Sequence, residues 1–391
     1  MSRRRRNVRK KGTARKPGTQ QNRPTVSVRV KASNNKTTKK RTISKRRRRN
    51  RLILIITSIV LVIAAAAFFI FRSDIFDSAP DQISVTVAWN PGSIADDIVR
   101  EMARATDTQI TIQNITGANG ANGANAIFQS ERNGASLLST SLSALVTAEA
   151  MGFTDNSYTD WAAWLCAFSP AVVVVANDSP YHSMDDLIAV IRQNPGRLRC
   201  ANSGDGTVSF VAAELLSTRV VLEFDHISYS GSSQAAEALK ESESQEAEAD
   251  FAILLSIEAA NHLRSGQLRA IGAFTGSDHF FSYGNPVITV PSISGIDHRL
   301  DNVLPFGEYF GLFIPTDTPQ SKLHGLDDLV NTVVDSQTFS HYLLNNGLVA
   351  TAIDRSENTQ VMEHFSSIIN WTLYDVGYLP TNPGALGIAR P

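Results

Sequence analysis

Cysteine is almost absent from the 391 residues of the sequence, which contain only Cys166 and Cys200. Two thiols in a chain of this length exclude a framework that depends on several disulfide bridges. Both cysteines lie in or beside runs that predict β-strands, so one bridge and two buried free thiols are both compatible with the sequence. Neither lies near the long apolar run described below, which excludes lipid attachment to a cysteine there.

Catalytic motifs are also missing. The sequence contains no G-x-S-x-G, no H-E-x-x-H and no phosphate-binding G-x-x-x-x-G-K. Its eight histidines are scattered, without a pair at the spacing of metal ligands. Aspartate directly precedes His226, His279 and His298, but neighbouring side chains in a strand point apart. We therefore expect a protein that is not an enzyme and that holds no metal and no cofactor.

Acidic residues are absent from residues 1–72. This segment contains 23 of the 37 lysines and arginines, so the rest of the chain has 14 basic and 37 acidic residues. Residues 1–51 have too few apolar side chains to bury a core, and we expect a disordered basic tail. Because no aromatic residue precedes Phe68, bases have no platform for stacking and nucleic-acid binding is disfavoured. We expect the tail to adhere to anionic lipids of the inner leaflet instead.

The longest apolar run extends from Leu52 to Phe71, twenty residues without a charge. A helix of that length spans ~30 Å, the thickness of a bilayer core. The arginines before it predict that the tail stays in the cytoplasm and that the acidic part is exported. A long cleaved signal peptide is the alternative. We expect an uncleaved, single-pass anchor in the cell membrane at residues 52–72 and a linker at residues 73–80.

Two stretches share one design, in which a short β-type run leads through a glycine turn into an amphipathic helix. Glycine lets the backbone approach a ligand closely, and the first turn of a helix offers free N–H groups and a positive dipole end. Two such turns facing each other would bind an anion without an arginine. The candidate residues are Trp89, Asn90, Gly92 and Ser93 in the first turn and Ser203, Gly204, Gly206 and Thr207 in the second.

The two helix starts differ in charge. Ser93 and Asp96 have the spacing of a capping box, so Asp96 is expected to bond to the start of its own helix. The second helix has no acid at the matching place, which leaves its N-terminus freer to meet an anion. Asp205 lies in that turn, and we expect its side chain to point outward to solvent.

From about Asp81 the chain alternates predicted strands and helices. The strands are expected at Ile83–Ala88, Gln109–Gln113, Ala171–Ala176, Val220–Phe224, Phe251–Leu255, Leu268–Ala273 and Tyr309–Ile314. The helices are expected at Ile94–Ala105, Met184–Gln193, Val208–Leu216, Ser233–Lys240, Glu258–Arg264, Ser321–Val334, Ser340–Leu343 and Thr359–Tyr374. This alternation is typical of an α/β protein with mostly parallel sheets covered on both faces. In such sheets ligands bind beyond the carboxyl ends of the strands, where both glycine turns lie.

Short motifs follow one another in a fixed order along this exported part. They are Gly92 with Asp96, the loop Asn114–Gly120, Asn194–Leu198, Ser203–Gly206, Ala212–Leu215, Tyr229–Gly231, Gly266–Ala270 and Tyr309–Pro315. Each motif is short, but over about 300 residues the ordered set resembles the substrate-binding receptors of tripartite tricarboxylate transporters.

The resemblance implies a two-lobed fold of the periplasmic-binding-protein type II class that closes on a small carboxylate. Lobe one would comprise residues 81–170 and 274–391, and lobe two residues 171–273. The partners would be the integral membrane subunits of a transporter. Trp89 could form an apolar wall, and the hydroxyls of Ser141, Ser143 and Thr207 could donate to the ligand. Tyr229 could cap its distal end, and Leu254 stands where the family often has aspartate.

The sequence also departs from the family. Ser93 replaces a glycine, and the leucines at 254 and 255 replace an aspartate and an asparagine, so an amino-acid ligand is less expected. Glu241–Glu248 is an acidic stretch that we interpret as a solvated loop. Two other functions stay open, namely a sensor that reports its ligand to a membrane signalling protein and an envelope-associated protein that no longer binds a ligand.

Overall fold

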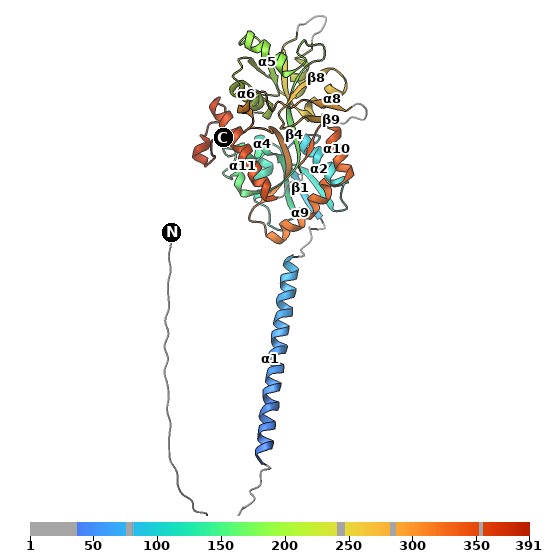
Figure 1. Ribbon diagram of the computed structural model, residues 1–391, viewed down its shortest axis with the longest axis vertical. Helices are drawn as coiled ribbons and strands as arrows, with labels where there is room; N and C mark the ends of the chain where they lie inside the picture. The colour runs from blue at the N-terminus through green and yellow to red at the C-terminus, as the bar shows by residue number, and fades with distance from the viewer. Residues whose placement is uncertain (1–36, 76–79, 81, 241–246, 282–286, 352–354) are drawn as a thin grey trace, which may run out of the picture. The chain divides into compact units, whose positions relative to one another are not determined.

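The computed structural model describes residues 37–75, 80, 82–240, 247–281, 287–351 and 355–391, with side chains described for residues 46–66 of the first range. The chain divides into two compact units, residues 1–70 and 71–391 (Figure 1). Residues 1–36 of the expected tail, residues 76–79 of the expected linker and residues 241–246 of the acidic stretch lie outside the described residues.

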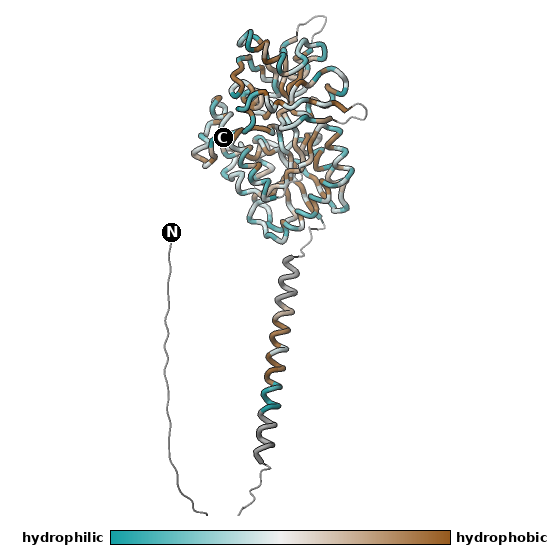
Figure 2. The backbone as a smooth tube through the Cα atoms, in the orientation of Figure 1, coloured by the Kyte–Doolittle hydropathy of each residue, from teal (hydrophilic) through white to brown (hydrophobic). Residues whose placement is uncertain are grey.

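One long helix, α1, spans Thr37–Ile75 and lies mostly in the first unit. It begins inside the segment expected to be disordered, so that prediction is wrong for residues 37–51. Lysine and arginine are good helix formers, and they extend the helix of the apolar run backwards. Among the described residues, Arg46–Ala66 is long and apolar enough to cross a membrane, and none of it is buried. Figure 2 shows that the coloured part of α1 begins with hydrophilic residues and continues with hydrophobic ones.

The second unit alternates strands and helices. Its strands are β1 Gln82–Val87, β2 Gln109–Asn114, β3 Ser136–Ser141, β4 Trp161–Ala176, β5 Arg199–Asn202, β6 Asp225–Ser228, β7 Phe251–Leu255, β8 Leu268–Ala273, β9 His279–Phe281, β10 Ile288–Val290, β11 Gly307–Pro315 and β12 Val349–Ala350. Its helices are α2 Ile94–Arg104, α3 Ala121–Phe128, α4 Leu142–Thr147, α5 Met184–Gln193, α6 Val208–Val220, α7 Ser232–Glu237, α8 Ser256–Arg264, α9 Gln320–Val334, α10 Gln337–Asn345 and α11 Arg355–Asp375. The alternation confirms the mixed α/β class.

Ten of these strands form one sheet in the order β2-β1-β3-β11-β4-β7-β5-β6, with β8 and β12 also paired to β4, and β9 and β10 pair with each other. The outer strands run parallel, since β1 pairs with β2 and β3, and β5 pairs with β6 and β7. The central pairs of β11 with β3 and of β4 with β11, β7 and β8 are antiparallel. The expectation of mostly parallel sheets is therefore wrong at the centre, where β4 and β11 run against their neighbours.

Strand β4 connects the two halves of the sheet. Its residues up to Pro170 pair with β11, and from Ala171 onward it pairs with β7 and β8. In Figure 1, α5, α6 and α8 lie around one end of β4, and α2, α9 and α10 lie around the other. The sequence predicts a strand only at residues 171–176, so the first part of β4 was not predicted. That part is buried on both faces, and such a run lacks the alternation that marks a half-buried strand.

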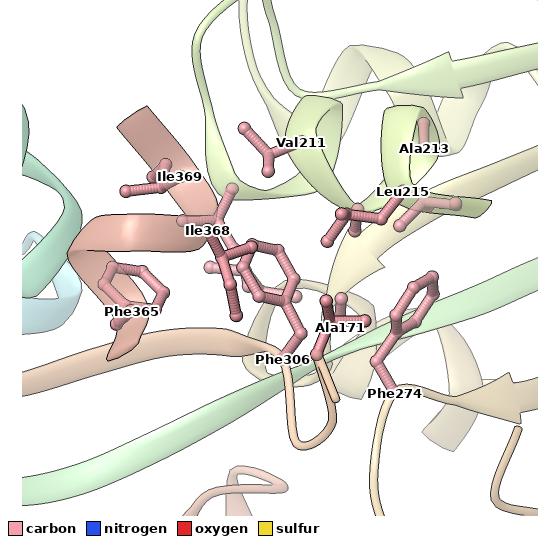
Figure 3. Close-up of a cluster of buried hydrophobic side chains, with 14 of the residues drawn as sticks. Ala171, Val211, Ala213, Leu215, Phe274, Phe306, Phe365, Ile368 and Ile369 are labelled. Carbon is pink, nitrogen blue, oxygen red and sulfur yellow. The ribbon is translucent and has the colours of Figure 1, made fainter. Parts of the chain in front are cut away.

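Helices cover both faces of the sheet. Along β4, Val173 and Val175 belong to one hydrophobic cluster and Val172 and Val174 to another, because successive side chains of a strand point to opposite faces. The first cluster continues from α6 to α11. Figure 3 shows its side chains from these helices, with Phe306 lying between them. This packing ties the last helix of the chain to the helix that follows the second glycine turn.

One of the predicted strands is wrong. Residues 220–224 were expected to form a strand, but α6 continues to Val220 and β6 begins only at Asp225. The periodicity of a short apolar run does not distinguish the end of a helix from a strand.

The two cysteines are not paired. Cys166 and Cys200 lie in β4 and β5 as buried free thiols, and burial raises the pKa of Cys166 to about 12.

Replacing Gly311 with alanine is expected to lower the free energy of unfolding by about 1–3 kcal/mol, the usual cost of overpacking. A Cβ at Gly311 would lie 2.3 Å from the carbonyl oxygen of Trp164 in the paired strand. Gly276→Ala is the matched control, because a Cβ there meets no atom within 4 Å. Urea unfolding measures both variants, and equal losses would contradict the packing of β11 on β4.

Candidate functional site

Both glycine turns border one cavity of about 540 Å³. The first half of the sheet and its helices contribute Trp89, Ser93, Ile94, Ala95, Asn119, Ser141, Ser143, Thr147, Met151, Phe153, Glu308, Phe310, Leu373 and Tyr378. The second half contributes Ser203, Asp205, Gly206, Thr207, Val208, Ser209, Leu255 and Glu258. Residues more than 100 positions apart in the sequence therefore meet around one space, at the carboxyl ends of β1 and β5.

The first turn leads from β1 into α2 through Gly92, whose φ of +78° favours glycine. Ser93 is the N-cap, and its Oγ accepts the N–H of Asp96 at 3.3 Å. The Asp96 carboxylate accepts the N–H of Gly92 at 2.9 Å and is held by Arg100 at 2.7 Å and by Asn114 at 3.1 Å. Asp96 therefore bonds next to the start of its own helix, as expected, although to the N–H of Gly92 and not to that of the N-cap Ser93.

Asp96 sits inside the fold rather than in the cavity. Burial alone would raise its pKa, but the hydrogen bonds from Arg100, Gly92 and Asn114 lower the pKa overall. The carboxylate therefore stays ionised and accepts its hydrogen bonds beside the start of α2 from inside the fold. Ser93, Ile94 and Ala95 at the start of α2 line the cavity. The first N–H groups of a helix have no hydrogen-bond partner within the helix itself.

The second turn leads from β5 into α6. Gly204 and Gly206 have φ of +126° and +78°, and Asn202 Oδ1 accepts the N–H of Gly204 at 2.9 Å. Thr207 is the N-cap, with its Oγ1 accepting the N–H of Phe210 at 3.3 Å. Helix α6 has no acid in its first turn. Its positive end is therefore not neutralised by a residue of its own.

Tyr378 packs directly on this turn. A Cβ at Gly206 would lie 2.4 Å from carbon atoms of the Tyr378 ring, so glycine is needed here for contact as well as for conformation. Tyr378 follows α11, the helix that packs on α6 (Figure 3). The end of the chain thereby shapes the wall of the cavity next to the second turn.

The structure brings most of the sequence-predicted site residues to the cavity. The candidates that line it are Trp89, Ser93, Ser141, Ser143, Ser203, Gly206 and Thr207. Asn90, Gly92 and Gly204 shape the turns without lining the cavity. Their contact with a ligand stays a prediction.

Two candidates do not lie at the cavity. The Tyr229 hydroxyl donates to Glu248 Oε2 at 3.0 Å instead of facing the space. Leu254 is fully buried in a hydrophobic cluster with Val172 and Val174 of β4. The next residue, Leu255, lines the cavity, because successive side chains of β7 point to opposite faces. The placement of Leu254 at the site is therefore corrected by one residue.

Two glutamates that are not among the predicted site residues also line the cavity. Glu308 lies in β11 and is only 4 % exposed. Its Oε1 accepts the N–H of Ser143 at 3.0 Å and that of Tyr309 at 3.1 Å, and its Oε2 accepts the Ser143 hydroxyl. The signal was present in the sequence, since Glu308 is the one charged residue of an otherwise apolar strand.

The second of these acids is Glu258, in the first turn of α8. Its Oε2 accepts the N–H of Leu255 at 2.9 Å and the Ser203 hydroxyl at 3.2 Å. Its position three residues after the N-cap Leu255 is the spacing of a capping residue. The hydroxyl of Ser143, expected as a donor to a ligand, thus donates to a glutamate of the protein, and so does the hydroxyl of Ser203.

Acids dominate the charge of the cavity. Burial raises the pKa of Glu308 to about 7 against the lowering effect of the hydrogen bonds from Ser143 and Tyr309. Burial likewise raises the pKa of Glu258. Asp205, expected to point away, is exposed but also borders the space. Within the described part of the chain, the lining includes no lysine, arginine or histidine.

A second cavity, of about 720 Å³, lies away from the glycine turns between α9 and α11. Its arginine, Arg355, is paired with both carboxylate oxygens of Asp327 at 3.0 Å, and Trp164 Nε1 donates to the same carboxylate at 2.8 Å. The charge of this arginine is therefore balanced within the protein. Over the residues whose placement is described, no group of three or more His, Cys, Asp or Glu side chains is arranged to hold a metal ion.

Comparison with known sequences identifies the family pattern. A family model described as the tripartite tricarboxylate transporter family receptor matches residues 94–368. A UPF0065 protein of Bordetella pertussis is 25% identical over 282 residues, which cover 71% of this chain and 83% of the relative. A UPF0065 protein encoded between tcbD and tcbE in a Pseudomonas species is 26% identical over 271 residues, covering 67% and 76%.

Solved structures share the fold. A TctC solute-binding protein from Polaromonas, without ligand, has a TM-score of 0.63 at 19% identity and covers 77% of this chain and 99% of its own. MatC from Rhodopseudomonas palustris with bound malate has a TM-score of 0.55 at 20% identity, covering 74% and 98%. Another R. palustris protein with adipate has a TM-score of 0.57 at 18% identity, covering 76% and 97%.

The raised pKa of Glu308 makes the stability of the protein depend on pH. Its protonated form is favoured in the folded state, so this contribution is present at low pH and is lost as pH rises through about 7. Glu308→Gln removes the titration and keeps an acceptor for the N–H groups. Between pH 5 and pH 8, the free energy of unfolding of the wild type should therefore fall relative to that of the variant by on the order of 3 kcal/mol. Urea unfolding at both pH values measures this, and parallel pH profiles would contradict it.

Proposed function

The chain belongs to the tripartite tricarboxylate transporter receptor family, and on that premise we propose that it captures a small carboxylate in the cavity between its two glycine turns. The family consists of extracytoplasmic solute-binding receptors, which are not enzymes. The observation that carries the proposal is the meeting of the first turns of α2 and α6 around one cavity of about 540 Å³. Relatives of the same fold bind malate and adipate, which supports a carboxylate as the ligand class.

The carboxylate would lie between the N–H groups at the start of α2 and those at the start of α6. Each helix end contributes about 0.3–1 kcal/mol, and ~2 kcal/mol when partly buried. Micromolar affinity requires about −8 kcal/mol. Charge-assisted hydrogen bonds of ~1.5–3 kcal/mol each, together with exclusion of water, would supply the remainder. Helix α6 would be the stronger end, because its first turn carries no acid, whereas α2 carries Asp96 and Asp97 there.

Exclusion of water would come from closure of two lobes, residues 81–170 with 274–391 and residues 171–273. The change of partners along β4, from β11 to β7 and β8, falls between Pro170 and Ala171 and supports the first boundary. The second would lie at the end of β8, at Ala273. The partners that receive the ligand would be integral membrane subunits of a transporter, as the family implies.

We also propose that α1 anchors the receptor in the cell membrane, with the basic tail on the cytoplasmic side near anionic lipids and the binding domain outside. The support is the stretch Arg46–Ala66, which has the length and composition of a membrane span. The arginines at 46–49 precede the apolar residues, as the positive-inside tendency requires.

Adding one negative charge at the start of α6 tests the carboxylate site. Thr207→Asp keeps an N-cap side chain but places a carboxylate where the ligand would bind. Its affinity for the carboxylates that the wild type binds should fall at least about tenfold, or 1.4 kcal/mol. Thr207→Asn is the matched neutral control and should stay within about threefold of the wild type. Isothermal titration calorimetry of the full-length chain measures both. Equal affinities of the Asp and Asn variants would refute binding at this helix.

Alkaline carbonate extraction tests the anchor. The full-length chain should stay in the membrane fraction, whereas a variant with four charged residues in the run 52–66, Ile55→Lys, Ile59→Lys, Ile63→Lys and Ala66→Lys, should be released, because each charge in the bilayer core is costly. The matched control places four serines at the same positions and should remain largely bound. Release of the wild-type chain would rule out an uncleaved anchor.

A further inference from the structure

Large apolar side chains from α4 and α11 line one part of the cavity between the glycine turns. They are Met151, Phe153, Leu373 and Tyr378, which we call the apolar face. The two helices lie side by side (Figure 1), and Asn370 Nδ2 of α11 donates to the carbonyl oxygen of Val146 in α4 at 3.0 Å. The apolar face is therefore built by two elements that are fixed to each other.

The apolar face extends from the second turn to the far end of α4. At one end, Tyr378 packs on Gly206. At the other, Met151 and Phe153 follow α4, a helix of 6 residues that rises by ~9 Å. The start of α4 follows β3, which pairs with β1, the strand before the first turn. The body of a ligand whose carboxylate lies at the two turns can therefore run along this face.

The polar side chains of the cavity offer few donors to a second polar group of a ligand. A hydroxyl has one proton to donate. Within the protein, Ser143 donates to Glu308, Thr147 to the carbonyl oxygen of Ser143, Ser203 to Glu258, and Thr207 to the carbonyl oxygen of Gly204. Among the described lining residues there is no lysine, arginine or histidine.

This lining treats the two ends of a ligand differently. The backbone N–H groups at the starts of α2 and α6 serve one carboxylate. A second carboxylate, as in malate or adipate, would leave water without enough donors to replace it, which is costly. An apolar body gains ~25 cal/mol for each Å² of surface that it removes from water.

We infer that this receptor takes a monocarboxylate with an apolar aliphatic or aromatic body and selects it over dicarboxylates. The inference rests on the proposed function, since the ligand carboxylate is taken to lie at the starts of α2 and α6. The apolar face then consists of specificity-determining residues that contact the body of the ligand. The cavity volume of about 540 Å³ leaves room for such a body.

Ligands matched in size test this selectivity on the full-length protein. Hexanoate is compared with adipate, and phenylacetate with its para-carboxylated derivative, so that each pair differs only at the far end. Calorimetry should show each monocarboxylate binding at least about tenfold tighter than its partner. The heat-capacity change of binding should be negative, as burial of apolar surface requires. Equal or tighter binding of the dicarboxylates would overturn the inference.

Variants of Phe153 assign the selectivity to the apolar face. Phe153 is 38% exposed, so Phe153→Ser removes apolar contact with little effect on the core. Affinity for hexanoate and phenylacetate should fall at least about threefold, and Phe153→Leu should restore most of it. Phe280→Ser is the matched control, because Phe280 is 53% exposed and does not line the cavity; its affinities should stay within about twofold of the wild type. Unchanged affinity of Phe153→Ser, shown by circular dichroism to be folded, would overturn the inference.

Failure of the inference and failure of the proposed function give different results. Preferred binding of dicarboxylates that Thr207→Asp abolishes would keep the carboxylate site and overturn only the selectivity. No binding of any of these ligands, or of a broader panel of carboxylates, would overturn both.

Discussion

The positive ends of two helices that meet around one cavity are the feature on which the proposed carboxylate binding depends. Their meeting requires glycine at positions where the backbone turns with positive φ, as at Gly92 and Gly206. At Gly206 the side chain must also be absent because the ring of Tyr378 occupies the adjacent space. The sheet then holds the two turns in position, since β4 pairs with both of its halves. The proposed binding by backbone N–H groups would explain how the cavity could hold an anion without a basic side chain among its described lining residues.

Electrostatics divides the cavity into two kinds of surface. The start of α6 carries no acid, while the acid of α2, Asp96, is turned inward and paired with Arg100. Two further acids line the cavity, the buried Glu308 and the half-buried Glu258, and burial raises the pKa of both. The fold is shared with relatives that bind malate and adipate, so the choice of ligand depends on side chains that line the cavity rather than on the fold.

Local patterns in the sequence predicted the features that depend on neighbouring residues. The glycine turns, the helices behind them and the cap formed by Asp96 follow from spacing, and the ordered motifs indicated the family. Features set by distant contacts were missed. The partners of β4 and the burial of Glu308 depend on pairing between strands far apart in the chain. The helix end at Val220 was mistaken for a strand because a short apolar run suits both. Leu254 and Leu255 could not be told apart, since the register of a strand decides which side chain faces the cavity.

A crystal structure of the chain with a bound carboxylate tests the central claim most directly. The account predicts that the carboxylate oxygens lie about 3 Å from N–H groups in the first turns of both α2 and α6. A carboxylate bound instead to a lysine or arginine elsewhere, with the start of α6 making no contact with it, would contradict the account.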